Sequence, residues 1–145
     1  MFDNETNAQA FLHHLLMQHQ QINAAADRAE RAWFGELPAS FVLDQVRRLQ
    51  DIIQRHFREE DAGGCIDEAV ARAPYLRGRA GEIESEHPRL LDKIQSIAER
   101  LGRLTASTTQ YDRLRREFEE FVEELRRHEA AENQLLEEAF GIEAD

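Results

Sequence analysis

The 145-residue chain is poor in cysteine, lysine, proline and glycine, and these shortages already exclude several classes of protein. Its single cysteine, Cys65, cannot build the disulfide framework of a small secreted domain. With 18 basic against 29 acidic residues the formal net charge is −11, so the chain lacks the basic surface that binds nucleic acid or anionic membranes. Residues 1–5 have neither the positive nor the apolar region of a secretory signal, and we expect a cytoplasmic protein.

The few prolines and glycines cluster at three places and divide the chain into four segments. These breaks cover residues 35–38, 61–74 and, more loosely, 102–109. The segments between them, about 6–34, 39–62, 77–103 and 108–140, show no period-2 alternation typical of strands. Long helices with short connections predict one all-α domain over residues 1–145, with its core at about 6–140. We expect an antiparallel, up-down-up-down four-helix bundle.

Each segment carries a seam of residues spaced alternately three and four apart, as in a helix that faces the axis of a bundle. A histidine interrupts every apolar seam, and a glutamate follows it one turn later on the second and fourth. In chain order the seams are Leu12, Leu15, His19, Ile22, Ala26 and Ala29; Val42, Val46, Leu49, Ile53, His56 and Glu60; Ile83, His87, Leu90, Ile94, Ile97 and Leu101; and Leu114, Phe118, Phe121, Leu125, His128, Glu132, Leu135 and Ala139.

The four seam histidines are expected at one level of the bundle. His19 and His56 lie fifteen and seventeen residues from the ends of the loop that joins their segments. His87 and His128 lie sixteen and twenty residues from the ends of theirs. Because a helix rises about 1.5 Å per residue, each pair agrees in depth to within about one turn. The imidazoles should therefore converge on a single layer.

A buried layer of histidines and glutamates needs something to satisfy its polar atoms, because burying an unpaired carboxylate costs several kcal/mol. No lysine or arginine stands on the seams at this level. Hydrogen bonds between histidine and glutamate in a purely structural bundle would satisfy part of the layer. A bound cation would satisfy all of it, and imidazole-rich ligation suits iron, copper, nickel or zinc. The candidate metal ligands are His19, His56, Glu60, His87, His128 and Glu132.

At these residues the sequence resembles the hemerythrin-like family, also called the HHE cation-binding domain. The similarity runs from about Leu12 to Leu136 and lies in two His-x-x-x-Glu runs, His56 to Glu60 and His128 to Glu132, that alternate with the single histidines His19 and His87. The resemblance implies a four-helix bundle with two non-haem iron ions, oxo- or hydroxo-bridged, that binds dioxygen or a related small molecule. It makes the four histidines terminal iron ligands and the two glutamates bridging carboxylates.

The third segment departs from the pattern of the oxygen-carrying members. They have a second histidine one turn from His87, where this chain has Ile83 and Leu91. Fewer protein ligands leave more open iron positions, which favours peroxide or nitric oxide chemistry over reversible oxygen carriage. A ferritin-like site fits less well, because it uses Glu-x-x-His pairs and more carboxylates than imidazoles.

The expected function is therefore that of a di-iron protein that binds or reduces a small oxidant: dioxygen, hydrogen peroxide or nitric oxide. Two alternatives stay open at this point. One is an iron- or oxygen-sensing regulatory module without turnover, and the other is iron storage. The expected partner is a small diatomic or peroxide ligand, with no nucleic acid and no membrane.

Several side chains near the seams are expected to lie outside the metal layer. Glu59, Gln18 and Glu86 are placed on solvated faces, although Gln18 and Glu86 each precede a seam histidine and are within reach of orienting an imidazole. His13 and His14 are expected at the surface. The large aromatic residues are expected to plug the ends of the bundle: Trp33, Phe34, Phe41 and Phe140.

Overall fold

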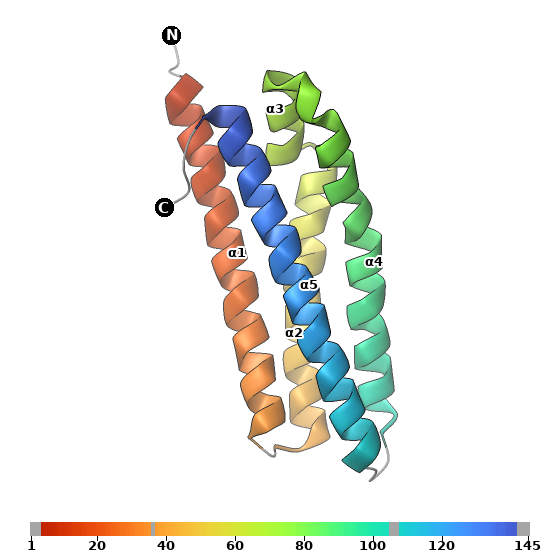
Figure 1. Cartoon of the computed structure of the whole chain (residues 1–145). Helices are drawn as coiled ribbons and strands as arrows, with labels where there is room; N and C mark the ends of the chain where they lie inside the picture. Colours follow the sequence, from red (N-terminus) through yellow and green to blue (C-terminus); the bar gives the residue numbers. More distant parts are fainter. Residues whose placement is uncertain (1–3, 36, 105–107, 142–145) are drawn as a thin grey trace.

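The computed structural model describes residues 4–35, 37–104 and 108–141, and most of them are helical. Four long helices lie side by side as a bundle (Figure 1): α1 (Asn4–Phe34), α2 (Ala39–Asp61), α4 (Arg77–Gly102) and α5 (Thr108–Phe140). In Figure 1, α1 and α4 run downward and α2 and α5 run upward. The prediction of an all-helical bundle is confirmed, and the helix bounds agree with the expected segments to within two residues.

The long helices form a closed ring of neighbours. α1 packs against α2 and α5, and α4 packs against the same two helices from the other side. This ring gives every long helix one face toward a shared interior. Over the described ranges 4–35, 37–104 and 108–141, no helix carries an apolar stretch that could cross a membrane.

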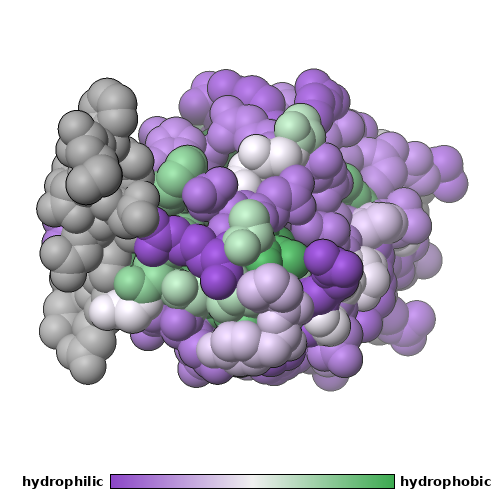
Figure 2. Space-filling view, turned by 90° about the horizontal axis from the view of Figure 1, so that it is seen from above, coloured by the Kyte–Doolittle hydropathy of each residue, from purple (hydrophilic) through white to green (hydrophobic). Residues whose placement is uncertain are grey.

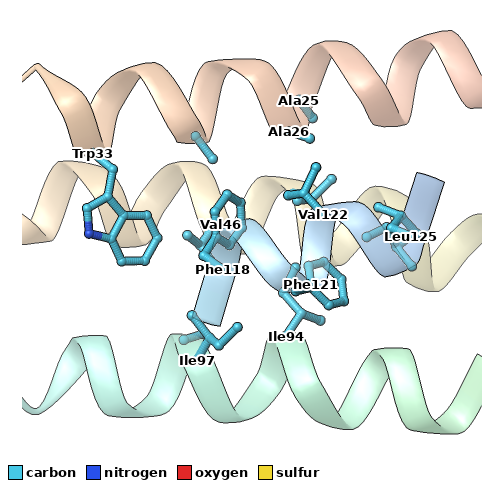
Figure 3. Packing of buried hydrophobic residues seen from close by; sticks show 14 of the residues in the cluster. Ala25, Ala26, Trp33, Val46, Ile94, Ile97, Phe118, Phe121, Val122 and Leu125 are labelled. Carbon is cyan, nitrogen blue, oxygen red and sulfur yellow. The ribbon is translucent and has the colours of Figure 1, made fainter. Parts of the chain in front are cut away.

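The seam residues fill this interior as the periodicity predicts. All of them are buried except Ala139, which is partly buried. Toward the loop between α1 and α2 they form one large core cluster with residues from all four long helices (Figure 3). At its end Trp33 stacks on Phe118, with ring centroids 5.2 Å apart. This core supplies most of the apolar burial that holds the bundle together.

A short helix, α3 (Cys65–Arg72), and the 3-10 turn η1 (Pro74–Leu76) lie between α2 and α4 and cover the opposite end of the bundle. Sequence analysis treated this stretch only as a break. Cys65, Ile66 and Ala69 on α3 are buried in two smaller core clusters with residues such as Leu136 and Leu135. Figure 2 looks onto this end and shows hydrophobic residues among hydrophilic ones. The α3 segment thus closes the interior from above.

Two of the four predicted end plugs are wrong. Trp33 and Phe140 are buried, whereas Phe34 is 59% exposed and Phe41 is 44% exposed. Phe34 is the last residue of α1, and its ring packs outside the core under the guanidinium of Arg115, which lies 5.0 Å from the ring centroid. Phe41 lines a shallow surface groove between α1 and α2. Both rings therefore lie on the surface of the bundle rather than across its ends.

The contrast between Phe118 and Phe34 gives a test of the core. Replacing the fully buried Phe118 by alanine should lower the free energy of unfolding by about 3–5 kcal/mol, because it removes a core ring and leaves a cavity. Phe34→Ala is the matched control and should cost about 1 kcal/mol or less, since it loses only a surface cation–π contact. Urea denaturation followed by circular dichroism measures both. Equal losses in the two variants would contradict the assigned core.

Candidate metal centre

The structure brings all six predicted ligands together in one layer that separates the large core cluster from the smaller clusters under α3. α1 and α4 each supply one histidine, and α2 and α5 each supply a histidine followed one turn later by a glutamate. Each of the six side chains belongs to a residue no more than 4% exposed: His19, His56, Glu60, His87, His128 and Glu132. The layer is therefore polar, buried and enclosed by apolar packing on both sides.

Within the layer the histidines direct their Nε2 atoms at the two glutamates. Oε1 of Glu132 lies 3.1 Å from Nε2 of His128 and 3.4 Å from Nε2 of His19. The two oxygens of Glu60 face different helices. Its Oε1 contacts Nε2 of His56 on α2, and its Oε2 lies 3.2 Å from Nε2 of His87 on α4. Both carboxylates thus sit between imidazoles of different helices.

These short contacts do not satisfy the polar atoms. The Nε2 atoms of all four histidines, and both oxygens of Glu60 and of Glu132, are buried without a hydrogen-bond partner among the described residues. Leaving such a group unpaired costs about 1–3 kcal/mol, and more if it is charged. Lone pairs from four imidazoles and two carboxylates that face one another are what a bound cation would satisfy.

The candidate ligand atoms fall into two overlapping groups, and within each group all atoms lie within 4.8 Å of one another. The first group has four residues and the second has three: Glu60, His87, His128 and Glu132; then His19, His56 and Glu132. Because Glu132 belongs to both groups, the residues present fit two cations that share it. Each group has two histidines and at least one carboxylate, which is a donor set of non-haem iron sites.

The outer nitrogen of His56, Nδ1, is held by a side chain of α1. The side-chain amide of Gln18 donates through Nε2 to the exposed Glu59, so its oxygen faces Nδ1 of His56 at 2.9 Å. Nδ1 must then carry a proton and donate it, so Nε2 is the nitrogen that faces the layer and would bind a metal once its own proton has left. The prediction that Gln18 lies on a solvated face is therefore wrong, whereas Glu59 is exposed as predicted.

Two further histidines are oriented in the same way by carboxylates. Oε1 of Glu86 lies 2.8 Å from Nδ1 of His128, and Oδ1 of Asp61 lies 3.0 Å from Nδ1 of His87. A carboxylate only accepts, so both Nδ1 atoms donate and both Nε2 atoms face inward. Glu86 is only partly exposed, which corrects its expected place on a solvated face. Sequence reasoning missed Asp61, whose signal was its place directly after Glu60 at the end of α2.

Sequence reasoning also missed Glu129. This residue is 5% exposed, and neither of its carboxylate oxygens has a hydrogen-bond partner among the residues described. Its Oε2 is 3.8 Å from Nδ1 of His19. Glu129 falls beside the seam rather than on it, so the periodicity assigned it no role. The available signal was its spacing of three residues from Glu132, which places both carboxylates on one face of α5.

Local structure fixes the position of Glu60 at the end of α2. The backbone amides of Gly63 and Gly64 both donate to the carbonyl of Glu60, at 3.3 Å. Gly63 has a φ of 103°, which L side chains rarely adopt, and a Cβ on Gly64 would lie 3.3 Å from the Cα of Glu60. The two glycines therefore let the chain turn tightly against the metal layer and enter α3. Beside the layer, the ring of Phe57 stacks on His87 with centroids 4.0 Å apart.

The close packing of these groups shifts their protonation. Burial lowers the pKa of His56, but the carboxylates of Glu132 and Glu60 outweigh this and raise it to about 10. Burial tends to raise the pKa of Glu132, yet its contacts with His128 and the other histidines hold it well below its usual range. Burial raises the pKa of Glu129 to about 7. A metal that binds Nε2 of His56 must displace a proton.

The thiol of Cys65 lies near this layer but is not poised for chemistry. It donates to the backbone carbonyl of Phe11, with sulfur and oxygen 3.6 Å apart. Burial, together with the charge of Glu60, raises its pKa to about 11. The thiol is therefore protonated at neutral pH and acts as a packing group.

Comparison with models of known protein families, with curated proteins and with solved structures gives no match for this chain.

Glu132 is the residue that both ligand groups share, and its replacement tests them together. Glu132→Gln should lower the amount of metal bound per chain, and should lower the melting temperature of the metal-loaded protein, because the carboxylate common to both ligand groups is lost. Glu120→Gln, on an exposed position of the same helix, is the control and should leave both unchanged. Elemental analysis and thermal melts give the two readouts. Wild-type metal content in Glu132→Gln would refute the ligand assignment.

The metal-free protein should lose stability as the pH rises. The pKa of His56 is raised from 6.5 to about 10 on folding, so its contribution is fully present below pH 6.5 and is lost between pH 6.5 and 10. The raised pKa of Glu129 acts in the same direction between pH 4.5 and about 7. Urea midpoints of chelator-treated protein between pH 6 and 10 measure this. In His56→Gln the decline above pH 7 should flatten, and an unchanged slope would speak against the assigned contacts.

Proposed function

We propose that the chain is a hemerythrin-like di-iron protein that binds or reduces a small oxidant: dioxygen, hydrogen peroxide or nitric oxide. One observation carries the proposal. Four imidazole Nε2 atoms and the oxygens of two carboxylates face one another in a buried layer without hydrogen-bond partners among the described residues, while the outer Nδ1 atoms of three of the rings are held in place. Such an arrangement is what a preformed metal centre would need, and it supports the proposal.

In the proposed centre each residue has a defined task. The terminal ligands would be His19, His56, His87 and His128, each through Nε2. Glu60 would bridge, because its two oxygens already face histidines on different helices. Glu132 would bridge as well, since it is common to both ligand groups. A pair of iron ions held in this way supplies redox and Lewis-acid chemistry toward a small oxidant.

The helix arrangement supports the family proposal. Its topology would be the antiparallel, up-down-up-down bundle expected for hemerythrin-like domains, and the helix directions in Figure 1 are in keeping with it. The four ligand-bearing helices are the four long helices of the ring. α3 is an addition that covers the end of the bundle nearest the two carboxylates.

The missing second histidine on α4 bears on which chemistry the centre favours. Ile83 and Leu91, one turn to either side of His87, are packed into core clusters and offer no donor atom. α4 therefore supplies one ligand, and the two groups have four and three protein donors. Since non-haem iron commonly keeps open positions beside such donor sets, the centre would have room for an exogenous ligand. This favours reduction of peroxide or nitric oxide over reversible carriage of dioxygen.

The surrounding residues would restrict access to small molecules. Phe57 covers His87 on one side and lies edge-on to His128, with centroids 5.2 Å apart. Leu125 and Leu135, on either side of His128 and Glu132 along α5, are fully buried. Such apolar walls exclude bulk water and strengthen electrostatic interactions at the centre.

Metal content and reactivity test the proposal directly. Protein purified without chelator, or reconstituted anaerobically with Fe²⁺, should contain about two irons per chain, one for each ligand group. After oxidation it should show the near-ultraviolet and visible charge-transfer absorption of bridged di-iron(III). Hydrogen peroxide, dioxygen and nitric oxide are then added separately in stopped-flow measurements.

The outcomes separate the functional alternatives. Repeated turnover of peroxide or nitric oxide identifies an enzyme, and one rapid oxidation without turnover identifies a sensor or store. Glu132→Gln serves as the centre-deficient control in each assay, and Glu120→Gln as the matched surface variant. A single zinc per chain, or no metal after anaerobic reconstitution, would overturn the di-iron proposal.

A further inference from the structure

The contacts that orient the histidines follow the ring of helices. Gln18 on α1 contacts His56 on α2, at 2.9 Å from its Nδ1. Asp61 on α2 contacts His87 on the next helix of the ring, α4, at 3.0 Å. α1 and α2 therefore each carry a histidine of their own and a polar group that holds the histidine of the next helix.

The third contact continues the same pattern. Glu86 on α4 lies 2.8 Å from Nδ1 of His128 on α5. One more contact, from α5 back to α1, would give every one of the four neighbouring helix pairs such a contact. His19 on α1 is the remaining histidine, and its Nδ1 has no hydrogen-bond partner among the described residues.

Glu129 occupies the place where the fourth contact belongs. It lies on α5, and its Oε2 is 3.8 Å from Nδ1 of His19, longer than a hydrogen bond. Both residues are nearly inaccessible, with side chains 5% and 6% exposed. The two carboxylates that hold His87 and His128 are far more exposed. The side chain of Asp61 is 55% exposed and that of Glu86 is 34% exposed. A buried carboxylate without a partner is costly, so its retention here calls for a role.

We propose that Glu129 is the positioning residue for His19 and closes the ring of outer contacts around the metal centre. This inference rests on the proposed function, because it concerns how one ligand is held toward a metal. Glu129 would accept a hydrogen bond from Nδ1 of His19, which fixes the tautomer with the Nε2 lone pair directed at the metal. The carboxylate would also make the imidazole a more basic ligand.

The geometry favours a positioning role over direct ligation. Oε1 of Glu132 lies on the Nε2 side of His19 at 3.4 Å, whereas Glu129 lies on the Nδ1 side. No oxygen of Glu129 belongs to the group of ligand atoms formed by His19, His56 and Glu132 within 4.8 Å of one another. The carboxylate thus stands behind the ring rather than in front of it.

Two substitutions at this position separate the roles. Glu129→Leu keeps the approximate volume but removes the acceptor, and Glu129→Gln keeps an oxygen that can accept from Nδ1. Glu123→Leu, at an exposed position on the same helix, is the matched control. Anaerobic titration with Fe²⁺ alone gives the stoichiometry and affinity at each position. For the tautomer, the imidazole nitrogens are observed by ¹⁵N NMR in Zn²⁺-loaded protein.

If Glu129 positions His19, Glu129→Leu weakens binding of one of the two ions by about 10–100-fold, and the other ion and the control are unaffected. Glu129→Gln should retain most of the affinity. In the NMR spectrum of the wild type His19 should carry its proton on Nδ1, and that proton should exchange faster with water in Glu129→Leu.

Two results would overturn the inference. Unchanged affinity and unchanged Nδ1 proton exchange in Glu129→Leu would show that Glu129 does not hold His19. Equal loss of the ion in Glu129→Gln and Glu129→Leu would show that the charged carboxylate itself is a ligand. Failure of the wild type to bind two ions would instead refute the di-iron proposal, so the two failures are distinguishable.

Discussion

The structure depends on one constraint: a layer of four imidazoles and two carboxylates is buried inside an otherwise apolar bundle. Atoms of this kind lose their water on folding and recover nothing from apolar neighbours. The protein meets part of this cost at the outer edge of the layer, where Gln18, Asp61 and Glu86 accept hydrogen bonds from the Nδ1 atoms of three rings. The inner Nε2 atoms and the carboxylate oxygens have no such partner among the residues that the structure describes. A bound cation is the one addition that satisfies all of them together.

Ligand geometry and helix packing therefore depend on each other. Because an outer contact always joins two neighbouring helices, a change in the rotation of one helix disturbs the histidine on the next. A bound metal would in turn tie the four helices together through the opposite edges of the same rings, so that binding energy becomes folding energy. The large apolar core below the layer and the α3 cover above it hold the helices in register. Without metal, the inner polar atoms of the layer have no hydrogen-bond partner among the described residues.

Periodicity alone was enough to predict the helices, their seams and the shared level of the histidines, because burial on a long helix follows its repeat. It was not enough to place residues beside the seams. Whether Gln18 and Glu86 face solvent or a neighbouring ring depends on helix rotation and side-chain rotamers, which a one-dimensional pattern does not contain. Glu129 was missed for the same reason, and Phe34 was predicted to plug an end of the bundle on its hydrophobicity alone. The α3 helix was hidden in a stretch whose glycines and proline signalled only a break.

The two halves of the layer are not equivalent, and on our proposal this difference matters for function. The half next to α4 combines two histidines with both glutamates, whereas the half next to α1 has two histidines and only the shared Glu132. Glu60 would still reach both ions, because its Oε1 contacts Nε2 of His56, so the two ions would differ less in their donors than in how their histidines are held. It is also on this side that the buried Glu129 stands behind His19. The orientation of a single imidazole would thus have its largest effect on the ion of the α1 side, because His19 is the one seam histidine whose Nδ1 has no hydrogen-bond partner among the described residues.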